Sequence, residues 1–574
     1  MVHADGIYRV SYNQLLTAGV PADQIDPRNI QLFYQGEEQY IYIKGEGSSG
    51  IFDPDSYIEF YARRNRAGID SLVYLTPSEM VNPDHSLFTD TSAYFLTWNT
   101  STTNRRLQLE TDVNFAAYTA NQPAYIWRTV RINYTTTYVK GSTRCIYGDG
   151  EGWFDSEIFR NHHPDGDLVV DKTIPTPQVH YGGPPTTLQT AVVGYAASKP
   201  DNYYPHHLKV SVSGNVIIEK LFTGYEHALG NATLNTSSLG TQLVLRYTAN
   251  DETVPDVPDQ MVVSFVSLRY PHTLNLENTG YFEFEVPVGS GAKQLVSLSG
   301  LSTSDNNNVV FYDLSNHRRI TVQYQSAAWK LLLPETGETH RCVIASSESI
   351  LQVDAIRRVS STDRFTDYQA AYPAAEFLMV AHESVWTSAQ QYATYRSAQG
   401  NSVALADISQ LYDQFAYGVQ KHPLSVTNFC NYMVPEGSPH QAFLFLFGKS
   451  VNSADMRNSA TNYAKCMVPS FGYPASDNLF TTAAGGTAFA PRLATGRICV
   501  NNNAEGQLYL AKVIEHESNL PAEWMKNVLH FGGGATTSEQ SSFANYLASY
   551  ENIIEDTLFG AYVSTFLKNS STPV

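Results

Sequence analysis

The alternation of apolar and polar residues changes character along the chain near residue 373. Before that point, short segments in which apolar and polar residues alternate are separated by clusters of glycine, proline, asparagine and aspartate. Alternation with a period of two is typical of strands that bury one face, and turn residues between such segments indicate antiparallel sheets. The pattern therefore predicts a β-rich region that takes up more than half of the chain.

Residues 1–135 form the first predicted domain, a small β-rich unit. Its alternating segments are residues 8–10, 30–34, 40–43, 57–61 and 93–98. One short helix, residues 12–17, is expected to interrupt them. It should end at Gly19, because glycine readily adopts the left-handed conformation that closes a helix.

Residues 136–350 show the same pattern on a larger scale and form the second predicted domain. Strands are expected at residues 207–212, 216–218, 242–247 and 261–266. Gly214-Asn215 lies between the first two strands and is a turn signal, which predicts a hairpin. Many strands separated by turn signals are typical of a β-sandwich or a jelly roll.

From residue 373 to residue 574 the pattern becomes one of alternating strands and helices. Strands are expected at residues 376–381, 403–406, 443–447 and 528–531, and helices at residues 386–396, 426–433 and 504–517. Residues 443–447 are apolar throughout, which indicates a parallel sheet covered on both faces. Asn503 is expected to cap the helix that follows it, and Thr537 begins a capping box. This third domain is predicted to be α/β with a mainly parallel sheet that is incomplete at Val574.

The composition of the chain argues against some classes of binding partner. The net charge of −18 and the pI near 5.3 argue against nucleic acid and anionic membrane surfaces. Only 16% of the residues are charged, and β-rich chains with such weakly charged surfaces are common outside the cell. No stretch of 18 apolar residues is present, so no membrane span is predicted. The first ten residues lack the layout of a signal peptide, which leaves the export signal open.

Two glycine-containing loops resemble phosphate-binding sequences but depart from the complete motifs. The GKS sequence at residues 448–450 follows a strand, yet Phe443 stands where the motif needs a glycine. The GGG sequence at residues 532–534 lies between a strand and a helix, yet Thr537 replaces the third glycine of the dinucleotide fingerprint. Tight strand-to-helix turns are the favoured interpretation, and nucleotide binding is rejected.

Histidine and acidic clusters give only weak signals for a metal. His162-His163 and His206-His207 are adjacent pairs, and adjacent side chains point to opposite faces of a strand, so solvated loops are favoured. Four acidic residues could hold calcium but fit no defined calcium loop: Asp149, Glu151, Asp155 and Glu157. No cofactor is therefore predicted, and a structural calcium ion stays a minor alternative.

The cysteines do not form a metal-binding pattern. They are scattered, without a C-x-x-C pair: Cys145, Cys342, Cys430, Cys466 and Cys499. A disulfide between Cys430 and Cys466 stays open, although buried thiols are favoured in a chain of this size. No G-x-S-x-G sequence supports a serine hydrolase, which leaves cysteine chemistry as the candidate.

Several sequence blocks occur in a characteristic order from about residue 376 to residue 550. They are the apolar strand ending at Gly448, Ser476-Asp477-Asn478 after Gly472-Tyr473-Pro474, Gly496-Arg497, the helix with Lys512 and Ile514 that leads to Glu517, and Trp524 before the strand at Val528. In order and spacing this region resembles the gingipain-type cysteine peptidases, whose catalytic domain has a caspase-like fold. Residues 5–12 and 150–154 resemble the β-rich region of larger members, among them the PorU-like members of type nine secretion.

The resemblance implies a Cys-His dyad in which the imidazole deprotonates the thiol and the thiolate attacks a peptide carbonyl. In that family the histidine precedes a glycine and the cysteine follows a small residue, and none of the 16 histidines or five cysteines here does so. By family order both residues are expected beyond Val574, after a strand at residues 559–566. This chain alone is therefore expected to be inactive, and Cys499 is expected to be a buried structural thiol.

Asp477 and Arg497 are the best-matched polar residues within the chain, and the resemblance marks them as site-supporting candidates. Loop architecture, calcium binding and support of the site stay open as their role, with structural bracing favoured. An Asx turn at Asp477 would explain that residue without catalysis. The acidic residue that gingipains carry after the strand at Val528 is replaced here by Gly534-Ala535.

Three functions follow from the resemblance. The first is a cysteine-type endopeptidase, a hydrolase that acts in proteolysis. The second is a sortase-like transpeptidase of type nine secretion, and the third is a non-catalytic secreted β-rich binding or adhesion protein. The resemblance implies a protein or peptide substrate, secretion-system components as partners, and a secreted or outer-membrane-associated location at the cell surface.

Overall fold

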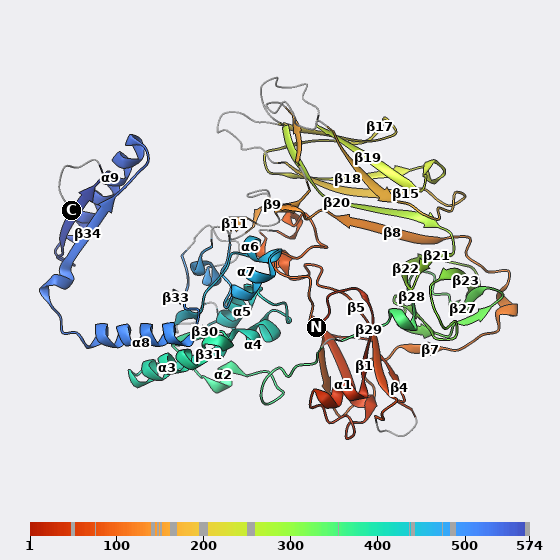
Figure 1. Ribbon diagram of the computed structural model, residues 1–574, viewed down its shortest axis with the longest axis horizontal. Coiled ribbons are helices and arrows are strands. Elements are labelled where there is room, and N and C mark those ends of the chain that lie inside the picture. The colour runs from red at the N-terminus through yellow and green to blue at the C-terminus, as the bar shows by residue number, and fades with distance from the viewer. Residues whose placement is uncertain are drawn as a thin grey trace. The chain divides into compact units, whose positions relative to one another are not determined.

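The structure is a computed structural model, and it describes most of the chain. The described residues are 1–47, 52–74, 76–138, 144–145, 148–149, 152–155, 157–160, 169–194, 205–249, 259–353, 355–435, 437, 442–472, 475–482 and 490–568. The chain divides into two compact units, Met1–Asn503 and Ala504–Val574. The expected order, β-rich domains followed by an α/β region with a parallel sheet, is confirmed (Figure 1).

Two small sheets begin the chain. The first has the strand order β29-β1-β5-β4 and consists of β1 (Gly6–Ser11), β4 (Tyr42–Lys44), β5 (Tyr57–Ala62) and β29 (Leu351–Gln352). The second consists of β2 (Ile30–Tyr34), β3 (Glu37–Glu38) and β6 (Phe95–Trp98). Helix α1 (Tyr12–Thr17) has the predicted bounds, because Ser11 and Gln14 close a capping box at its N-terminus and Gly19 follows its end with a φ of 81°.

A ten-stranded sheet forms the centre of the β-rich region. Along the sheet its strands are β18 (His227–Leu234), β15 (Thr186–Gly194), β20 (Asp259–His272), β8 (Ile126–Asn133), β22 (Tyr281–Val286), β28 (His340–Ser346), β24 (Val309–Asp313), β25 (Arg318–Ile320) and β7 (Gln108–Glu110), with β13 (Glu157–Arg160) beside β20. β7 and β8 come from the range predicted as the first domain, yet they pair with strands of the second. The two ranges are thus joined by strand pairing.

Two four-stranded sheets cover different parts of this large sheet. One consists of β14 (Val169–Pro175), β19 (Gln242–Ala249), β16 (Pro205–Val212) and β17 (Asn215–Thr223), and the other of β21 (Asn275–Thr279), β23 (Lys293–Leu301), β27 (Ala328–Pro334) and β26 (Gln323–Gln325). Each buries an apolar core against the large sheet. Residues 136–350 therefore contain two sheet-on-sheet cores side by side (Figure 1).

The hairpin between β16 and β17 is present, but its turn differs from the prediction by one residue. Val212 pairs with Asn215, so the turn residues are Ser213 and Gly214 instead of Gly214 and Asn215. Both have positive φ, 49° and 83°. A two-residue turn of this type matches the twist of the flanking strands, which accounts for the register.

The α/β part of the first unit is built on a parallel sheet with the order β31-β30-β32-β33. Its strands are β30 (Phe377–Ala381), β31 (Val403–Asp407), β32 (Phe443–Phe447) and β33 (Ala494–Ile498). Its helices are α2 (Tyr368–Ala371), α3 (Trp386–Ala398), α4 (Ile408–Phe415), α5 (Leu424–Met433), α6 (Ser453–Arg457) and α7 (Ala460–Lys465). The predicted strands and helices up to residue 447 are therefore confirmed, with small shifts at their ends.

Both faces of this sheet are covered, as the apolar strand at residues 443–447 predicts. Leu444 and Leu446 belong to the core that α4 and α5 complete. Phe445 faces the other way and stacks on Tyr392 of α3, with 4.9 Å between the ring centroids. Because successive side chains of a strand point to opposite faces, only a continuously apolar strand satisfies both environments.

Asn503 lies within the helix before which it was expected to stand. It is the first residue of α8 (Asn503–Ser518), and its side-chain oxygen accepts a hydrogen bond from Ser388 N in α3 at 2.9 Å. Ser388 lies in the first turn of α3, where backbone N–H groups have no partner within the helix. Asn503 therefore satisfies one of these N–H groups of α3.

The second unit pairs two strands in parallel, β34 (Asn527–Gly532) and β35 (Tyr562–Leu567), with α9 (Thr537–Ile554) between them in sequence. The strands expected at residues 528–531 and 559–566 are thereby confirmed in type, the second with a later start. The capping box of α9 is formed by Thr536 and Glu539, one residue earlier than expected. Taken by itself, this unit contains a two-stranded sheet.

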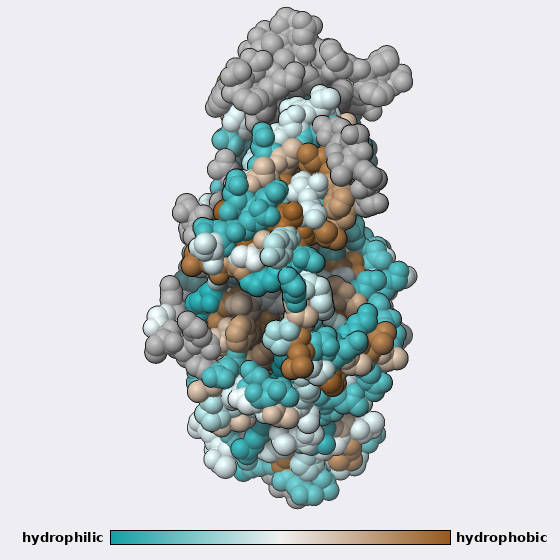
Figure 2. All heavy atoms as spheres, turned by 90° about the vertical axis from the view of Figure 1, so that its left-hand side faces the viewer, coloured by the Kyte–Doolittle hydropathy of each residue, from teal (hydrophilic) through white to brown (hydrophobic). Residues whose placement is uncertain are grey.

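The hydropathy of the surface agrees with the mixed composition of the chain. On the face that Figure 2 shows, hydrophobic and hydrophilic residues are interspersed. None of the helices in the described part of the chain is long and apolar enough to cross a membrane.

Candidate functional site

The carboxyl edge of the parallel sheet gathers the loops that follow β30, β31, β32 and β33. In open α/β sheets this edge is where ligands bind and where chemistry takes place. Both site-supporting candidates, Asp477 and Arg497, lie here: Arg497 is on β33, and Asp477 begins the 3-10 helix Asp477–Thr481. The edge is therefore the candidate site of this structure.

Arg497 connects three segments of this edge. Its Nη1 donates to Gly448 O after β32 and to Val468 O, both at 2.9 Å. Its Nη2 donates to Pro469 O at 2.7 Å. An arginine side chain has five N–H donors in a fixed fork, and the remaining two bind Asp477. All five donors of this guanidinium are thus used.

Asp477 binds Arg497 with both carboxylate oxygens. Oδ2 accepts from Nε at 2.7 Å and Oδ1 accepts from Nη2 at 2.8 Å. The side chain of Arg497 is only 8% exposed, and such a bidentate, partly desolvated pair is stronger than a surface ion pair. Both carboxylate oxygens thus bind Arg497, a different contact from the Asx turn that was one explanation for Asp477. The geometry is that of a brace, and its contribution to a catalytic site stays a prediction.

Gly448 is required at the end of β32 for conformational reasons. Its φ is 137°, and a Cβ atom at this position would lie 3.0 Å from Met467 Cβ. Gly448 N donates to Ile498 O at 3.0 Å and Lys449 N donates to Val500 O at 3.1 Å. These N–H groups are engaged in strand pairing and are not free to cradle a phosphate.

The glycine-rich turn after β34 also lacks a free anion site. The Glu539 carboxylate accepts hydrogen bonds from Ala535 N at 2.8 Å and from Thr536 N at 3.1 Å. These backbone bonds hold the pKa of Glu539 below its usual value. The N-terminus of α9 is therefore occupied by an acid of the chain itself, as expected for a tight turn.

Three titratable groups at the carboxyl edge of the four-stranded sheet were not singled out from the sequence: His382 after β30, Asp407 at the end of β31, and Lys421 between α4 and α5. Burial, followed by the charge of Lys421, lowers the pKa of His382. Burial raises the pKa of Asp407, against the opposing effect of the hydrogen bond from Ser409 N. Titratable groups with perturbed pKa values often lie at functional sites.

Lys421 is 8% exposed, and burial lowers its pKa. Its Nζ donates to Cys466 O at 2.5 Å. The ammonium group therefore fixes the backbone of the loop that follows β32. No local motif marks Lys421, because its partner lies 45 residues away.

Two of the described cysteines, Cys342 and Cys430, are unreactive buried thiols. Burial raises the pKa of Cys430 to about 12 and that of Cys342 well above its usual value, and protonated, buried thiols are unreactive. Cys430 and Cys466 are both free, so the alternative of a disulfide between them is excluded. Cys499 is exposed, which corrects the expectation of a buried thiol. In the described ranges no thiol contacts a histidine ring.

The predicted metal candidates do not come together. No group of three or more potential metal-ligating residues occurs among the described residues. Asp155 pairs with Lys172. The side chains of Asp149, Glu151, Glu157 and His162-His163 lie outside the described residues.

His206 and His207 lie on a strand, β16, and not in a solvated loop. His206 is buried, and its Nδ1 lies 2.6 Å from Asp259 Oδ1. His207 points to the opposite face, where its Nε2 lies 2.6 Å from Glu219 Oε1. The two side chains thus diverge as adjacent strand residues must, and each has its own carboxylate partner.

Comparison with known proteins gives a family match for the α/β region. Residues 370–572 match the model of peptidase family C25. Among solved structures, dimeric latent PorU from Porphyromonas gingivalis has a TM-score of 0.52 at 13% sequence identity, with 94% of this chain and 53% of that chain covered. The likeness shows a shared multidomain fold, and this chain spans about half the length of that protein.

A second structural match is limited to one part of the chain. A family 35 carbohydrate binding module from Clostridium thermocellum covers 26% of this chain and 95% of its own, with 14% identity and a TM-score of 0.14. No curated protein matches the chain significantly.

Proposed function

We propose, from the premise that residues 370–572 form a domain of peptidase family C25, that the protein carrying this chain is a cysteine endopeptidase of the gingipain kind. At the level of the family, the domain is that of a cysteine peptidase. We propose in addition that this domain cleaves peptide bonds, that it uses a Cys-His dyad and that its substrate is a protein or peptide. The observation that carries it is the family match over a parallel sheet whose carboxyl edge is braced by Arg497.

The proposed reaction uses a thiolate and an imidazole. The imidazole takes the thiol proton, and the thiolate sulfur attacks the carbonyl carbon of a peptide bond. The C–N bond breaks, the amine leaves with the proton from the imidazolium, and water hydrolyses the thioester. Because the dyad of the family follows the strand at residues 559–566, we place both residues C-terminal to Val574.

In this proposal the chain supplies the frame of the site. Arg497 and Lys421 fix the loop after β32 by binding its carbonyl oxygens. Fixed loops hold substrate and catalytic groups in a reactive geometry, which lowers the entropic part of the barrier. Asp477 and Arg497 are then site-supporting residues that do not themselves touch the reacting atoms.

Cleavage assays test the proposal. A form of the protein that continues past Val574 should cleave unfolded protein substrates, and iodoacetamide should abolish the cleavage. The chain that ends at Val574 should be inactive. Absence of alkylation-sensitive cleavage in the longer form would overturn the proposal and favour the non-catalytic binding or adhesion function.

A sortase-like transpeptidase is the second candidate function, supported by the shared fold with PorU. Both reactions pass through the same thioester, and only the acceptor differs. An added amine should appear in the product if transpeptidation occurs, whereas hydrolysis gives a free carboxylate. We further propose a secreted or cell-surface location, with secretion-system components as partners, which fractionation of the source cells tests.

No cofactor is required by the proposed chemistry. EDTA should therefore leave cleavage unchanged. If a structural calcium ion binds near residues 149–157, EDTA should instead lower the midpoint of thermal unfolding, and added calcium should restore it. This result separates structural calcium from a catalytic metal.

A further inference from the structure

The loop that follows β32 is a long excursion at the carboxyl edge of the sheet. Residues 450–466, here termed the 450–466 excursion, carry α6 and α7. The chain closes this excursion at its base, where Met467 N donates to Lys449 O at 2.9 Å. Because β32 is parallel to its neighbours, the excursion leaves the sheet on the same side as the Arg497 brace.

The base of the excursion is held from within the α/β region, but α6 is held from outside it. Arg457 at the end of α6 donates from Nε to Ser86 O at 2.8 Å and from Nη2 to Asp90 Oδ1 at 2.7 Å. Its side chain is 7% exposed. Ser86 and Asp90 belong to the β-rich N-terminal region, so this contact joins the two parts of the first unit.

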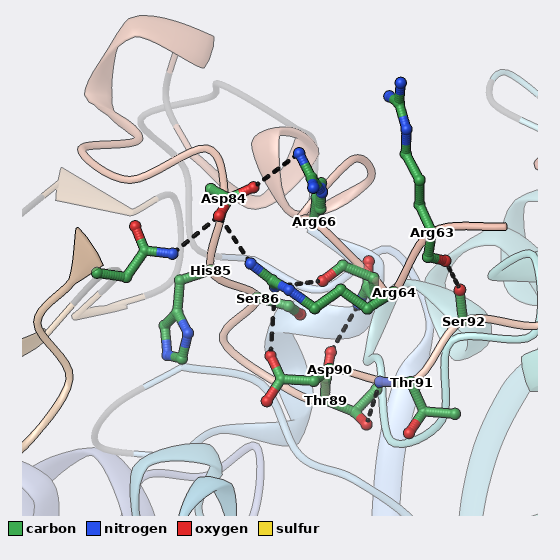
Figure 3. A network of polar contacts seen from close by, with 12 residues as sticks. Arg63, Arg64, Arg66, Asp84, His85, Ser86, Thr89, Asp90, Thr91 and Ser92 are labelled. Atoms are coloured by element: carbon green, nitrogen blue, oxygen red, sulfur yellow. Dashed lines mark hydrogen bonds and ion pairs between the residues drawn. The ribbon is translucent and has the colours of Figure 1, made fainter. Parts of the chain in front are cut away.

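The segment that receives Arg457 is itself firmly held. Figure 3 shows Arg64 between Asp84 and Asp90. Arg64 Nη2 lies 2.7 Å from Asp84 Oδ2, and the same oxygen accepts from Asn133 Nδ2 at 2.8 Å. Asn133 is the last residue of β8 in the ten-stranded sheet. The 84–92 segment is therefore anchored to the ten-stranded sheet.

We infer that Arg457 is a positioning residue for the proposed peptidase: it fixes the 450–466 excursion to the 84–92 segment and so shapes the substrate-binding side of the carboxyl edge. The inference rests on the proposed function, because it assigns the excursion to the site of that reaction. Lysine is a poor substitute, since only the planar fork of arginine reaches a carbonyl and a carboxylate together.

Hydrogen exchange on the present chain tests the positioning directly. In Arg457→Met, amides of residues 450–466 should exchange roughly 10- to 100-fold faster, as expected for loss of charged hydrogen bonds. Amides of β30 and β32 should keep their rates. Arg358→Met is the matched control, because Arg358 is an exposed arginine paired with Asp363 elsewhere on the surface. Unchanged exchange in residues 450–466, or an equal increase everywhere, would overturn the inference.

Two further variants keep the test decisive if Arg457→Met does not fold. Asp90→Asn removes the charged partner and leaves the bond to Ser86 O, so a smaller acceleration of the same amides is expected. Arg457→Lys should restore part of the protection. Wild-type exchange in Asp90→Asn would contradict the inference.

Kinetics on the form that continues past Val574 separate positioning from a merely structural role. Loss of a wall of the binding site should raise KM several-fold with a smaller change in kcat, and Arg457→Lys should recover part of this loss. A fall in kcat at unchanged KM would overturn the inference. If the wild-type protein cleaves nothing, the proposed function fails, while the exchange experiment still decides whether Arg457 holds the excursion.

Discussion

At the scale of single residues, Arg497 is the group on which most of the candidate edge depends. Its guanidinium binds three backbone carbonyls and one carboxylate. Removing one partner from a buried charged network leaves the others unpaired, and this is far more costly than the loss of a surface ion pair. Variants of Arg497 and variants of Asp477 should therefore differ clearly in stability.

Arg497→Met should lower the free energy of unfolding by roughly 3–5 kcal/mol. Asp477→Asn should cost less, because the three carbonyls keep their donors. Urea denaturation of both variants measures the difference, with Arg358→Met as the exposed control. An equal cost for Arg497→Met and Arg358→Met would show that the brace carries no stability.

His85 should make the stability of the protein depend on pH. It is 8% exposed, and its Nδ1 lies 3.4 Å from Arg457 Nη2. Burial first, and then the charge of Arg457, lowers the pKa of His85 to about 4, while Asp90 and Asp70 act in the opposite direction. The folded state therefore keeps His85 neutral at a pH where the unfolded chain already binds the proton.

The difference between the pKa of His85 in the folded and in the unfolded state sets the direction in which stability changes with pH. The protein should lose stability as the pH falls below about 6.5, the usual pKa of histidine, and the loss should be complete below about 4, reaching roughly 3 kcal/mol. Other groups titrate in the same range, so the measurement is the difference between the wild type and His85→Gln. Parallel pH profiles of the two proteins would contradict this role for His85.

What the sequence predicts at this scale depends on distance along the chain. Asp477 and Arg497 are 20 residues apart and stand in ordered blocks, which is why both could be singled out. Arg457 and Asp90 are 367 residues apart, and no local pattern links them. His382, Asp407 and Lys421 come from three different segments of the chain, so only the folded sheet shows that they share an edge.

At the scale of elements, periodicity predicted the α/β strands well. The strand Phe443–Phe447 has the predicted bounds, because two covered faces require a continuous apolar run. Helix ends were less predictable, since two neighbouring residues often compete for the cap. Thr536 rather than Thr537 caps α9, and the side chain of Asn503 accepts a hydrogen bond from Ser388 N of α3.

The second unit should be the least protected part of the chain. Of its described side chains, few are buried, and large apolar residues such as Leu529 and Phe531 are about 60% exposed. Local opening is easiest where few apolar contacts form. Amides of residues 528–566 should exchange faster than those of β30 and β32. Full protection through residues 528–566 would contradict the expectation that this unit is marginally stable.

At the scale of the whole molecule, buried charges join the first sheet to the ten-stranded sheet. Glu59 on β5 is 0% exposed and accepts from Tyr312 Oη at 2.6 Å and from Arg319 Nε at 3.0 Å. Arg9 on β1 completes the group at 2.7 Å. Sequence patterns could not predict this junction, since register and long-range pairing are not encoded in alternation alone.

Glu59→Gln should therefore destabilise the β-rich region by roughly 3–5 kcal/mol, because Arg9 and Arg319 lose their shared carboxylate. Tyr312→Phe should cost less, since it removes only one hydrogen bond to the carboxylate. Thermal unfolding measures both. A loss for Glu59→Gln no larger than that for Tyr312→Phe would show that the buried carboxylate does not hold the two sheets together.

The central claim, that this chain is the frame of a cysteine peptidase whose nucleophile lies beyond Val574, is tested most directly by covalent labelling. A peptide carrying an electrophilic ketone is incubated with the form that continues past Val574, and the modified residue is located by mass spectrometry. Among the cysteines whose side chains are described, Cys499 is the exposed one and therefore a competing thiol. The expected result is labelling of one cysteine C-terminal to Val574 and of none before it. Peptide-dependent labelling of Cys499, or of no cysteine at all, would contradict the claim.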